Sequence, residues 1–368
     1  MHLTSGPARK PCVVLDARMA FHSGIGRYIR GLTRALLAAE PSPELSFLGA
    51  PDGGGATWLE GRVVPNVPYN AGIYTVREQF LGSWICRRLE SRTSVFHFPH
   101  YNVPLRMPRA SVVTIHDMTH LQFPEYFSTV RVAFARRVLK RAVTRAARII
   151  TVSEATRTAL ERWFPDTAAR ATVIHHGVDE PFRPLPPGRL EGLRERHGPG
   201  RWLVYAGNTK PHKNLPRILA AYEQLRAGSD PPRLVLVLTA DADPPPVPEG
   251  VRVLRDLSDE QLAQWYNLSD ALLLPSLNEG FGLTALEAMA CGTPVIGSTI
   301  DALQEVVGDG GVLVNPHDVG AIASAMRSVL TDEALRVDLA ARARERAKGF
   351  TWEKAAEQTL EVYAMAGR

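Results

Sequence analysis

Short apolar runs recur along this chain, and helical patterns fill the intervals between them. Such alternation is typical of parallel sheets, because a crossover helix must bring the chain back before the next strand can run parallel to the last. One stretch rich in Pro and Gly, residues 181–200, interrupts the alternation. The sequence therefore predicts two doubly wound α/β domains, residues 1–180 and 201–349, joined by a linker over 181–200. The predicted strands are residues 12–15, 46–48, 95–98, 111–115, 148–152 and 171–174, followed by 202–206, 233–239, 251–254, 271–274, 294–296 and 311–314.

The segment from residue 271 to residue 296 combines a strand, a glycine-rich turn and a helix from about Leu283 to residue 290. The N–H groups and the positive dipole end of such a helix favour an anion. Two carboxylates flank the turn, Glu279 before it and Glu287 within the helix. Carboxylates beside an anion site are unfavourable unless they bind hydroxyl groups. A nucleotide-diphospho-sugar offers both, a diphosphate for the amides and sugar hydroxyls for the acids.

This segment resembles the E-x7-E region of the retaining glycosyltransferases of sequence family 4, which have the GT-B fold. Other motifs match in family order from about residue 12 to residue 316. They are the first strand and glycine loop at 13–16 and 23–29, the histidine strand end at 114–117, the domain-closing signature at 151–153 and 175–184, and the start of the donor domain at 204–207 with Lys213-Asn214. The resemblance covers nearly the whole chain.

The resemblance implies a GT-B enzyme in which two Rossmann-like domains face a central cleft. The N-terminal domain would bind the acceptor, and the C-terminal domain would bind the nucleotide-sugar donor. It also implies that the last helix, within residues 350–368, packs back onto the first domain.

In the first domain, Gly24, Ile25 and Gly26 follow a predicted strand and precede a predicted helix at 27–37. Glycines let backbone amides approach a phosphate closely, although a plain tight turn is the alternative. The resemblance implies that this loop faces the diphosphate. It also places His116 beside the donor sugar, where its backbone carbonyl and ring would stabilise positive charge at the anomeric carbon. The alternative for His116 is a histidine that caps a loop.

In the second domain, Lys213 follows a predicted strand and would neutralise the leaving diphosphate. Most family members carry an arginine four to six residues earlier, whereas this chain has Gly207-Asn208-Thr209 there. Asn208 and Lys210 are therefore included in the donor-binding set. What replaces the arginine, Lys210 or an arginine elsewhere, is left open.

The glycine-rich turn and helix supply the remaining donor ligands. By resemblance, Glu279 binds hydroxyls of the donor sugar and acts with His116 and Lys213 in catalysis, while Glu287 binds the ribose hydroxyls. The alternatives are an acid favoured by the helix dipole at Glu279 and a solvated helix face at Glu287. The donor-binding residues of this segment are Gly280, Phe281, Gly282, Leu283, Thr284 and Glu287.

No metal or other cofactor is expected. Asp241-Ala242-Asp243 has the D-x-D pattern that binds a divalent metal in other glycosyltransferases, but it precedes three prolines in a loop. The resemblance implies that basic side chains and a helix dipole stabilise the leaving group instead of a metal.

Charge is distributed unevenly, with a balance of +9 over residues 1–180 and −4 over residues 181–368. Residues 131–148 hold seven basic side chains and no acidic one. This segment is predicted to be either a core-packing helix with a solvated basic face or a helix that lies on an anionic membrane surface, to which residues 74–92 would add. No nucleic-acid-binding motif accompanies the basic residues, so nucleic acid is not an expected partner.

The predicted function is a retaining, metal-independent transfer of a hexose, with mannose as the first guess, from a GDP- or UDP-sugar. The expected acceptor is a glycan or lipid-linked glycan in cell-surface polysaccharide synthesis. A soluble glycosyltransferase of natural products and a non-catalytic subunit that binds nucleotide sugars are the alternatives. The expected location is the cytoplasm, with peripheral attachment at the inner membrane face. This follows from three cysteines without metal-ligand spacing (Cys12, Cys86 and Cys291) and from the lack of a long apolar run.

Overall fold

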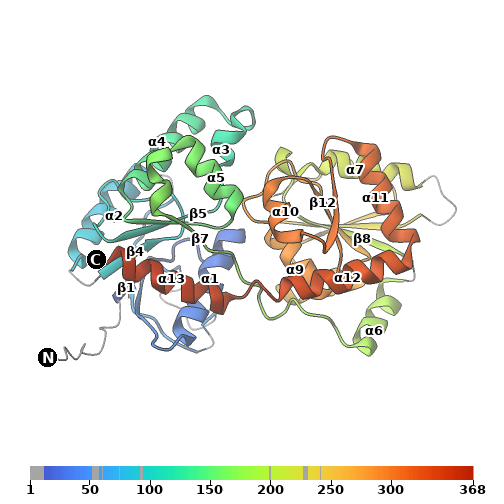
Figure 1. Ribbon diagram of the computed structural model, residues 1–368, viewed down its shortest axis with the longest axis horizontal. Coiled ribbons are helices and arrows are strands. Elements are labelled where there is room, and N and C mark those ends of the chain that lie inside the picture. Colours follow the sequence, from blue (N-terminus) through green and yellow to red (C-terminus); the bar gives the residue numbers. More distant parts are fainter. Residues whose placement is uncertain are drawn as a thin grey trace. The chain divides into compact units, whose positions relative to one another are not determined.

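The computed structural model describes residues 12–51, 58–59, 61–73, 75–91, 94–198, 200–226, 231–240 and 242–367. The chain divides into two compact units, Met1–Gly177 with Thr351–Arg368, and Val178–Phe350 (Figure 1). Each unit contains one parallel sheet covered by helices. The prediction of two doubly wound α/β domains is therefore confirmed.

Within the described residues, the sheet of the first unit has seven parallel strands in the order β3-β2-β1-β4-β5-β6-β7. The strands are β1 (Cys12–Asp16), β2 (Glu44–Leu48), β3 (Asn66–Val67), β4 (Ser94–Phe98), β5 (Ser111–Ile115), β6 (Arg148–Thr151) and β7 (Ala171–Val173). The helices are α1 (Ser23–Ala38), α2 (Val76–Leu89), α3 (Thr119–Gln122), α4 (Thr129–Arg145), α5 (Glu154–Trp163) and α13 (Trp352–Ala366), with 3-10 turns η1 (Pro124–Tyr126) and η2 (Pro165–Arg170).

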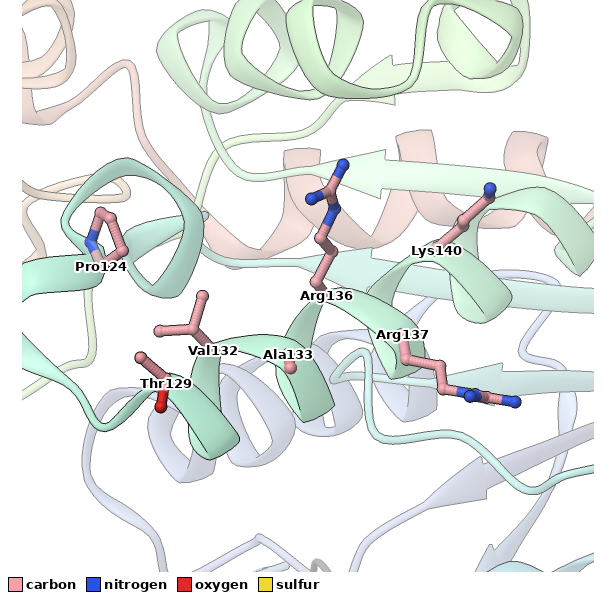
Figure 2. A pocket seen from close by; sticks show the side chains of 7 residues that line it. All are labelled: Pro124, Thr129, Val132, Ala133, Arg136, Arg137 and Lys140. Atoms are coloured by element: carbon pink, nitrogen blue, oxygen red, sulfur yellow. The ribbon is translucent and has the colours of Figure 1, made fainter.

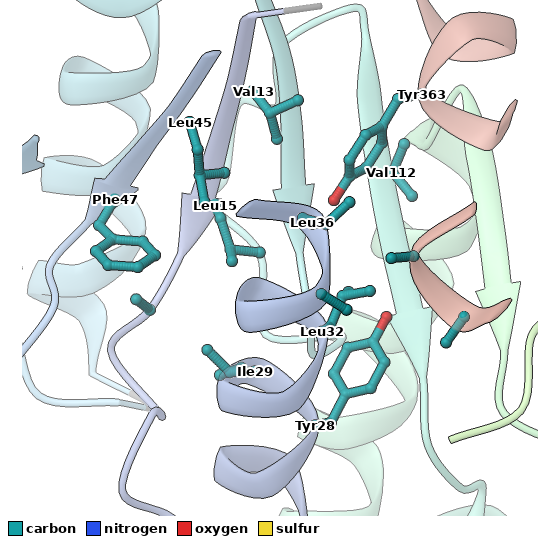
Figure 3. Close-up of a cluster of buried hydrophobic side chains, with 14 of the residues drawn as sticks. Val13, Leu15, Tyr28, Ile29, Leu32, Leu36, Leu45, Phe47, Val112 and Tyr363 are labelled. Carbon is teal, nitrogen blue, oxygen red and sulfur yellow. The ribbon is translucent and has the colours of Figure 1, made fainter. Parts of the chain in front are cut away.

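Both faces of this sheet are buried, because successive side chains of a strand point to opposite faces. Val13 and Leu15 of β1 join a core cluster with Leu32 of α1 and Tyr363 of α13 (Figure 3). Val14, between them, joins a second cluster with residues of α2, α4 and α5. This explains why the strand reads as a continuous apolar run in the sequence.

The described part of the second unit has a six-stranded parallel sheet in the order β10-β9-β8-β11-β12-β13. Its strands are β8 (Trp202–Gly207), β9 (Arg233–Leu238), β10 (Val251–Arg255), β11 (Ala271–Leu274), β12 (Val295–Ser298) and β13 (Gly311–Val314). Its helices are α6 (Pro187–His197), α7 (Leu215–Arg226), α8 (Asp259–Leu268), α9 (Leu283–Cys291), α10 (Asp301–Val307), α11 (Val319–Thr331) and α12 (Glu333–Ala347), with the 3-10 turn η3 (Pro211–Lys213).

Each sheet has one point at which the strand order reverses. In the first sheet it lies between β1 and β4, and in the second between β8 and β11. The loops that leave the carboxyl ends of two such strands diverge to opposite faces, which opens a crevice where ligands bind in open α/β sheets. The predicted site residues lie in or next to the segments that follow the carboxyl ends of β1, β5, β8 and β11.

The segment 181–200 is not the linker that the sequence predicted. It contains α6, which begins at Pro187, buries Leu193 and packs against α8 in the second unit. Proline at the start of the helix and Gly198 at its end, with φ of +90°, are usual helix boundaries and account for the composition. The chain instead passes between units at Gly177 and again at Phe350, and α13 packs against α1 in the first unit.

Candidate functional site

The loops at the switch point of the second sheet bring Lys213 and Glu279 together. Lys213 ends η3 after β8, and Glu279 lies between β11 and α9. The lysine ammonium nitrogen donates to both carboxylate oxygens of Glu279, at 2.8 and 2.9 Å. The two side chains are only 16% and 9% exposed, so the pair is shielded from water and its charge-assisted bonds are strong. The sequence predicted both as site residues but not that they bind each other.

Asn214, which follows Lys213, fixes the loops around this pair. It has the left-handed backbone conformation, with φ of +63°, which asparagine tolerates better than most residues. Its side-chain amide donates to the carbonyl oxygens of Pro275, at 2.8 Å, and Pro316, at 2.7 Å. The Ser276 hydroxyl donates to Glu279 at 2.7 Å. In the sequence, Asn214 is recognisable only as part of the Lys213-Asn214 motif, and Ser276 carries no recognisable signal on its own.

Helix α9 begins at Leu283, directly after the loop that carries Glu279. Its N-cap residue Gly282 has φ of +100°, and a Cβ there would lie 2.8 Å from Leu303. Only glycine therefore fits this turn without strain. Phe281 is buried, with its ring 5.8 Å from that of Phe350, while Thr284 in the first turn is partly buried. The helix N-terminus favours an anion beside this turn.

Glu287 lies one turn further along α9 and is 3% exposed. The Tyr266 hydroxyl donates to its Oε2 at 3.4 Å. Burial and the neighbouring Glu287 raise the pKa of the Cys291 thiol. The alternative of a solvated helix face at Glu287 is therefore excluded, because a carboxylate is buried only where partners compensate its lost hydration.

The remaining predicted donor residues of this unit lie in the loop after β8. The Tyr205 hydroxyl donates to the Asn208 carbonyl, and the Asn208 side chain accepts from the backbone N–H of Lys210 at 3.1 Å. The Lys210 side chain is exposed. Arg217, in the first turn of α7, donates to the Asn214 side chain at 2.8 Å. The sequence does not indicate this arginine as a site residue, yet it lies next to the loop that lacks the usual arginine.

In the first unit, Gly24, Ile25 and Gly26 lie in the first turn of α1, which begins at Ser23. The prediction of a glycine loop ahead of a helix starting at residue 27 is therefore wrong. A Cβ on Gly26 would lie 2.6 Å from the Ala20 carbonyl oxygen, so glycine lets the helix start pack against the preceding turn. The motif still presents helix N-terminal amides, whose partial positive charge favours an anion.

His116 follows β5 and is held by two backbone interactions. Its Nε2 donates to the Pro99 carbonyl at 2.9 Å, and its own carbonyl accepts from the Thr156 hydroxyl at 3.3 Å. Burial lowers the pKa of His116 to about 4, so the imidazole is neutral near pH 7. The side chain of Asp117 caps the turn that follows by accepting from the N–H of Thr119 at 2.9 Å.

A buried hydrogen-bonded chain that the sequence did not reveal runs beside His116. His97 Nδ1 lies 2.7 Å from the Tyr363 hydroxyl, and its Nε2 lies 2.8 Å from the Thr114 hydroxyl. Thr114 in turn lies 3.0 Å from the Tyr28 hydroxyl. The chain links β4 and β5 to α1 and to the C-terminal helix α13.

A second buried network lies at the carboxyl end of β1. Arg18 binds Asp16 at 2.6 Å and Glu78 of α2 at 2.5 Å. Asn102, after β4, donates to Glu78 at 2.6 Å, and the Arg18 guanidinium lies 4.1 Å from the centre of the Tyr69 ring. These contacts fix α2 and the loop after β4 to the switch point of the first sheet.

Among the described residues, no three His, Cys, Asp or Glu side chains gather in the way a metal site requires. Asp241 of the D-x-D pattern lies outside the described residues, and Asp243 is exposed. No helix in the described part of the chain is long and apolar enough to cross a membrane.

Solved structures that match nearly the whole chain define the class of fold. Sucrose-phosphate synthase from Thermosynechococcus elongatus matches 97% of this chain and 98% of its own, with a TM-score of 0.75 and 21% identity. WaaG, a glycosyltransferase involved in lipopolysaccharide biosynthesis, matches 95% of this chain and 99% of its own, with a TM-score of 0.73 and 14% identity. The chain therefore has the GT-B fold that the sequence motifs predicted.

Sequence comparisons then identify the family. The model described as Glycosyltransferase Family 4 matches residues 22–181, and the one described as Glycosyl transferases group 1 matches residues 195–346. O-antigen chain mannosyltransferase B of Escherichia coli is 30% identical over 375 residues, covering 93% of this chain and 96% of that protein. D-inositol 3-phosphate glycosyltransferase of Xylanimonas cellulosilytica is 37% identical over 218 residues, which is 54% of this chain and 52% of that protein. The chain belongs to this family of GT-B glycosyltransferases, and the resemblance seen in the sequence is confirmed.

Proposed function

We propose that this glycosyltransferase transfers a hexose, with retention of anomeric configuration, from a nucleotide-diphospho-sugar to a hydroxyl of a glycan or lipid-linked acceptor in cell-surface polysaccharide synthesis. The observation that carries the proposal is the shielded Lys213–Glu279 pair ahead of the N-terminus of α9, with Glu287 buried one turn further on. A cation, a helix N-terminus and two carboxylates match the chemistry of a diphosphate flanked by sugar hydroxyls.

Each group then has a defined part in the proposal. Lys213 and the amides of residues 280–283 bind the diphosphate. As Lys213 turns from Glu279 to a phosphate oxygen, the carboxylate of Glu279 becomes available to accept bonds from hydroxyls of the donor sugar. Glu287 accepts bonds from the ribose hydroxyls, with Tyr266 holding its position.

The proposed reaction is a displacement on one face of the sugar. The acceptor hydroxyl oxygen forms a bond to the anomeric carbon while the bond from that carbon to the phosphate oxygen breaks. The acceptor proton passes to the departing phosphate oxygen. His116 stabilises the positive charge that develops at the anomeric carbon, and its low pKa supports a neutral ring that exchanges no proton in the step.

Mannose is the first choice of sugar, supported by the match to a mannosyltransferase of O-antigen chains. For the nucleotide, GDP and UDP are both proposed. A structural match, HepE of Anabaena, was solved in complex with UDP-glucose and shares 18% identity with a TM-score of 0.73 over 96% of this chain and 99% of its own. The proposed reaction uses no metal. A lipid-linked acceptor would place the enzyme at the cytoplasmic face of the inner membrane.

The test is a thermal-unfolding screen with UDP-, GDP-, dTDP- and ADP-sugars, with and without magnesium, on the native protein and on Glu287→Ala. A ligand that binds the folded state raises the melting temperature by mass action. The expected result is a rise with one nucleotide class that is independent of magnesium and lost in the variant. No rise with any nucleotide would contradict the donor-site assignment.

The selected donor is then supplied with candidate acceptors, and the anomeric configuration of the product is read by NMR. Retention is expected with a glycan or lipid-linked acceptor. Donor binding without turnover on any acceptor would favour the non-catalytic subunit, and turnover only on small aglycones would favour an enzyme of natural products.

A further inference from the structure

Helices α2 and α4 of the first unit expose large apolar side chains. On α2, Phe80 and Trp84 are 63% and 55% exposed. On α4, Val130 and Phe134 are 77% and 44% exposed. The members of each pair are four residues apart and therefore lie on one face of their helix. Large apolar groups that gather on a surface mark a site of interaction.

The two helices form one continuous surface. The Arg141 guanidinium of α4 donates to the Gln79 side chain of α2 at 2.6 Å. Leu105, which is 42% exposed, joins them, because its N–H donates to the Gln79 carbonyl at 3.3 Å and its carbonyl accepts from Arg145 at 2.8 Å. Phe134 lies on the same helical stripe as Arg141. The α2–α4 surface is defined by Phe80, Trp84, Leu105, Val130 and Phe134 with the exposed cations of both helices.

Those cations are Arg77, Arg87 and Arg88 on α2 and Arg131, Arg136, Arg137, Lys140 and Arg145 on α4. Helix α4 has no acidic residue. Burial and the neighbouring guanidinium groups of Arg145 and Arg137 lower the pKa of Arg141, whose acceptor on α2 is a neutral amide. Helix α4 therefore supplies positive charge that its own side chains do not neutralise.

A hollow of about 640 Å³ opens beside α4. Its apolar lining includes Val132, Ala133 and Pro124, and its cations are Arg136, Arg137 and Lys140. Figure 2 shows Arg136 and Lys140 extending to the same side of the helix, while Arg137 extends away from them. Apolar walls with adjacent cations suit an anion that is attached to an apolar body.

We propose that the α2–α4 surface docks on an anionic lipid bilayer and that the hollow beside α4 receives a lipid phosphate. Aromatic side chains such as Phe80, Trp84 and Phe134 favour the boundary between headgroups and acyl chains. Basic side chains around them are attracted to anionic headgroups. A nucleic acid would also match the charge, but it would leave the aliphatic Val130 and Leu105 without an apolar partner.

Binding is measured by co-sedimentation with phosphatidylcholine vesicles that contain or lack phosphatidylglycerol. The native protein is expected to bind only the anionic vesicles, and to bind them less at high salt. Replacing Arg136, Arg137 and Lys140 together by Gln should weaken binding by on the order of 100-fold, since each basic residue near the surface contributes about fivefold. The double variant Phe80→Ser with Trp84→Ser should weaken vesicle binding even at low salt, where the cations attract the anionic headgroups most strongly.

A matched control makes the same kinds of change on the second unit, with Val337→Ser and Arg327→Gln, both of which replace exposed side chains. This control should bind as the native protein does, and all variants should keep the native melting temperature. Absence of binding to anionic vesicles, or equal binding by the folded variants and the control, would overturn the proposal. If added duplex DNA abolished binding to the vesicles, the surface would be assigned to nucleic acid instead. Vesicle binding does not require turnover, so failure of the proposed glycosyl transfer would leave this result unaffected.

Discussion

The ammonium nitrogen of Lys213 lies within 2.9 Å of both carboxylate oxygens of Glu279, although the sequence assigns the two side chains to different parts of the donor. A phosphate that enters this site must compete with Glu279 for the lysine. The proposed donor site therefore predicts that donor binding and the opening of this ion pair are linked.

Removing Lys213 should affect both folding and turnover. In Lys213→Ala, the shielded carboxylate of Glu279 loses its counter-charge, and we expect the free energy of unfolding to fall by about 1–3 kcal/mol. The double variant Lys213→Met with Glu279→Gln should recover much of this stability, because no charge is left unpaired. It should not recover turnover, which we expect to fall about 100-fold or more in each variant.

These effects are measured by urea-induced unfolding and by kcat/KM. The control is Lys348→Ala, which removes an ion pair between Lys348 and Glu345, whose side chains are 72% and 76% exposed. This change should alter neither the free energy of unfolding nor kcat/KM. If the double variant regained turnover, the pair would be structural only.

Replacing Glu287 should weaken donor binding with little effect on folding. Glu287→Gln keeps the size of the side chain and an acceptor for Tyr266, but it removes the charge from the bonds proposed to the ribose hydroxyls. Loss of a charge-assisted hydrogen bond is expected to raise Kd for the nucleotide about 10- to 100-fold. Tyr266→Phe should have a smaller effect, because its bond to Glu287 is long at 3.4 Å. Calorimetric titration with UDP and GDP measures both, and unchanged affinity in Glu287→Gln would contradict the assignment.

The fold was predictable because its strands are buried on both faces and read as apolar runs. Every predicted strand has a counterpart, and the missed β3 is two residues long, Asn66–Val67, too short for any periodicity. Helix α6 was missed because it buries little apart from Leu193. Pro and Gly at the two ends of α6 are typical of linkers as well as of helix boundaries.

The sequence assigns Lys213 and Glu279 to the candidate site, but it does not predict the contact between them. Lys213 and Glu279 are 66 positions apart, and they meet because β8 and β11 are neighbours in the sheet. Neighbouring strands are set by packing of the whole unit, which no local pattern encodes. Arg18 illustrates the same limit, since its partner Glu78 lies 60 positions away.

Arg18 should be essential for folding of the first unit. Arg18→Met removes the cation between Asp16 and Glu78, whose side chains are 8% and 1% exposed. Loss of the cation that binds two buried carboxylates is expected to cost about 3–5 kcal/mol. Adding Asp16→Asn should restore part of this loss. Urea-induced unfolding measures both variants, and Arg183→Met, which removes a 63% exposed partner of Glu180, is the control with little expected change. A stability of Arg18→Met within about 0.5 kcal/mol of the native value would contradict this account.

The buried histidines of the first unit should make the protein less stable in acid. Burial lowers the pKa of His97 to about 3 and of His116 to about 4, and it lowers the pKa of His176 well below its usual value. As the pH falls below about 6.5, the unfolded chain takes up protons that the folded protein does not, so the free energy of unfolding decreases toward pH 4. Each of these histidines should add a slope of about 1.4 kcal/mol per pH unit in this range and none above it.

Urea-induced unfolding between pH 5 and pH 8 measures this slope. His116→Gln still offers a donor for the Pro99 carbonyl. It should reduce the slope below pH 6 by the contribution of one proton, about 1.4 kcal/mol per pH unit. His317→Gln, at an exposed position in the second unit, is the control and should leave the slope as it is. A slope that His116→Gln and His317→Gln change equally would show that burial of the first-unit histidine is not its cause.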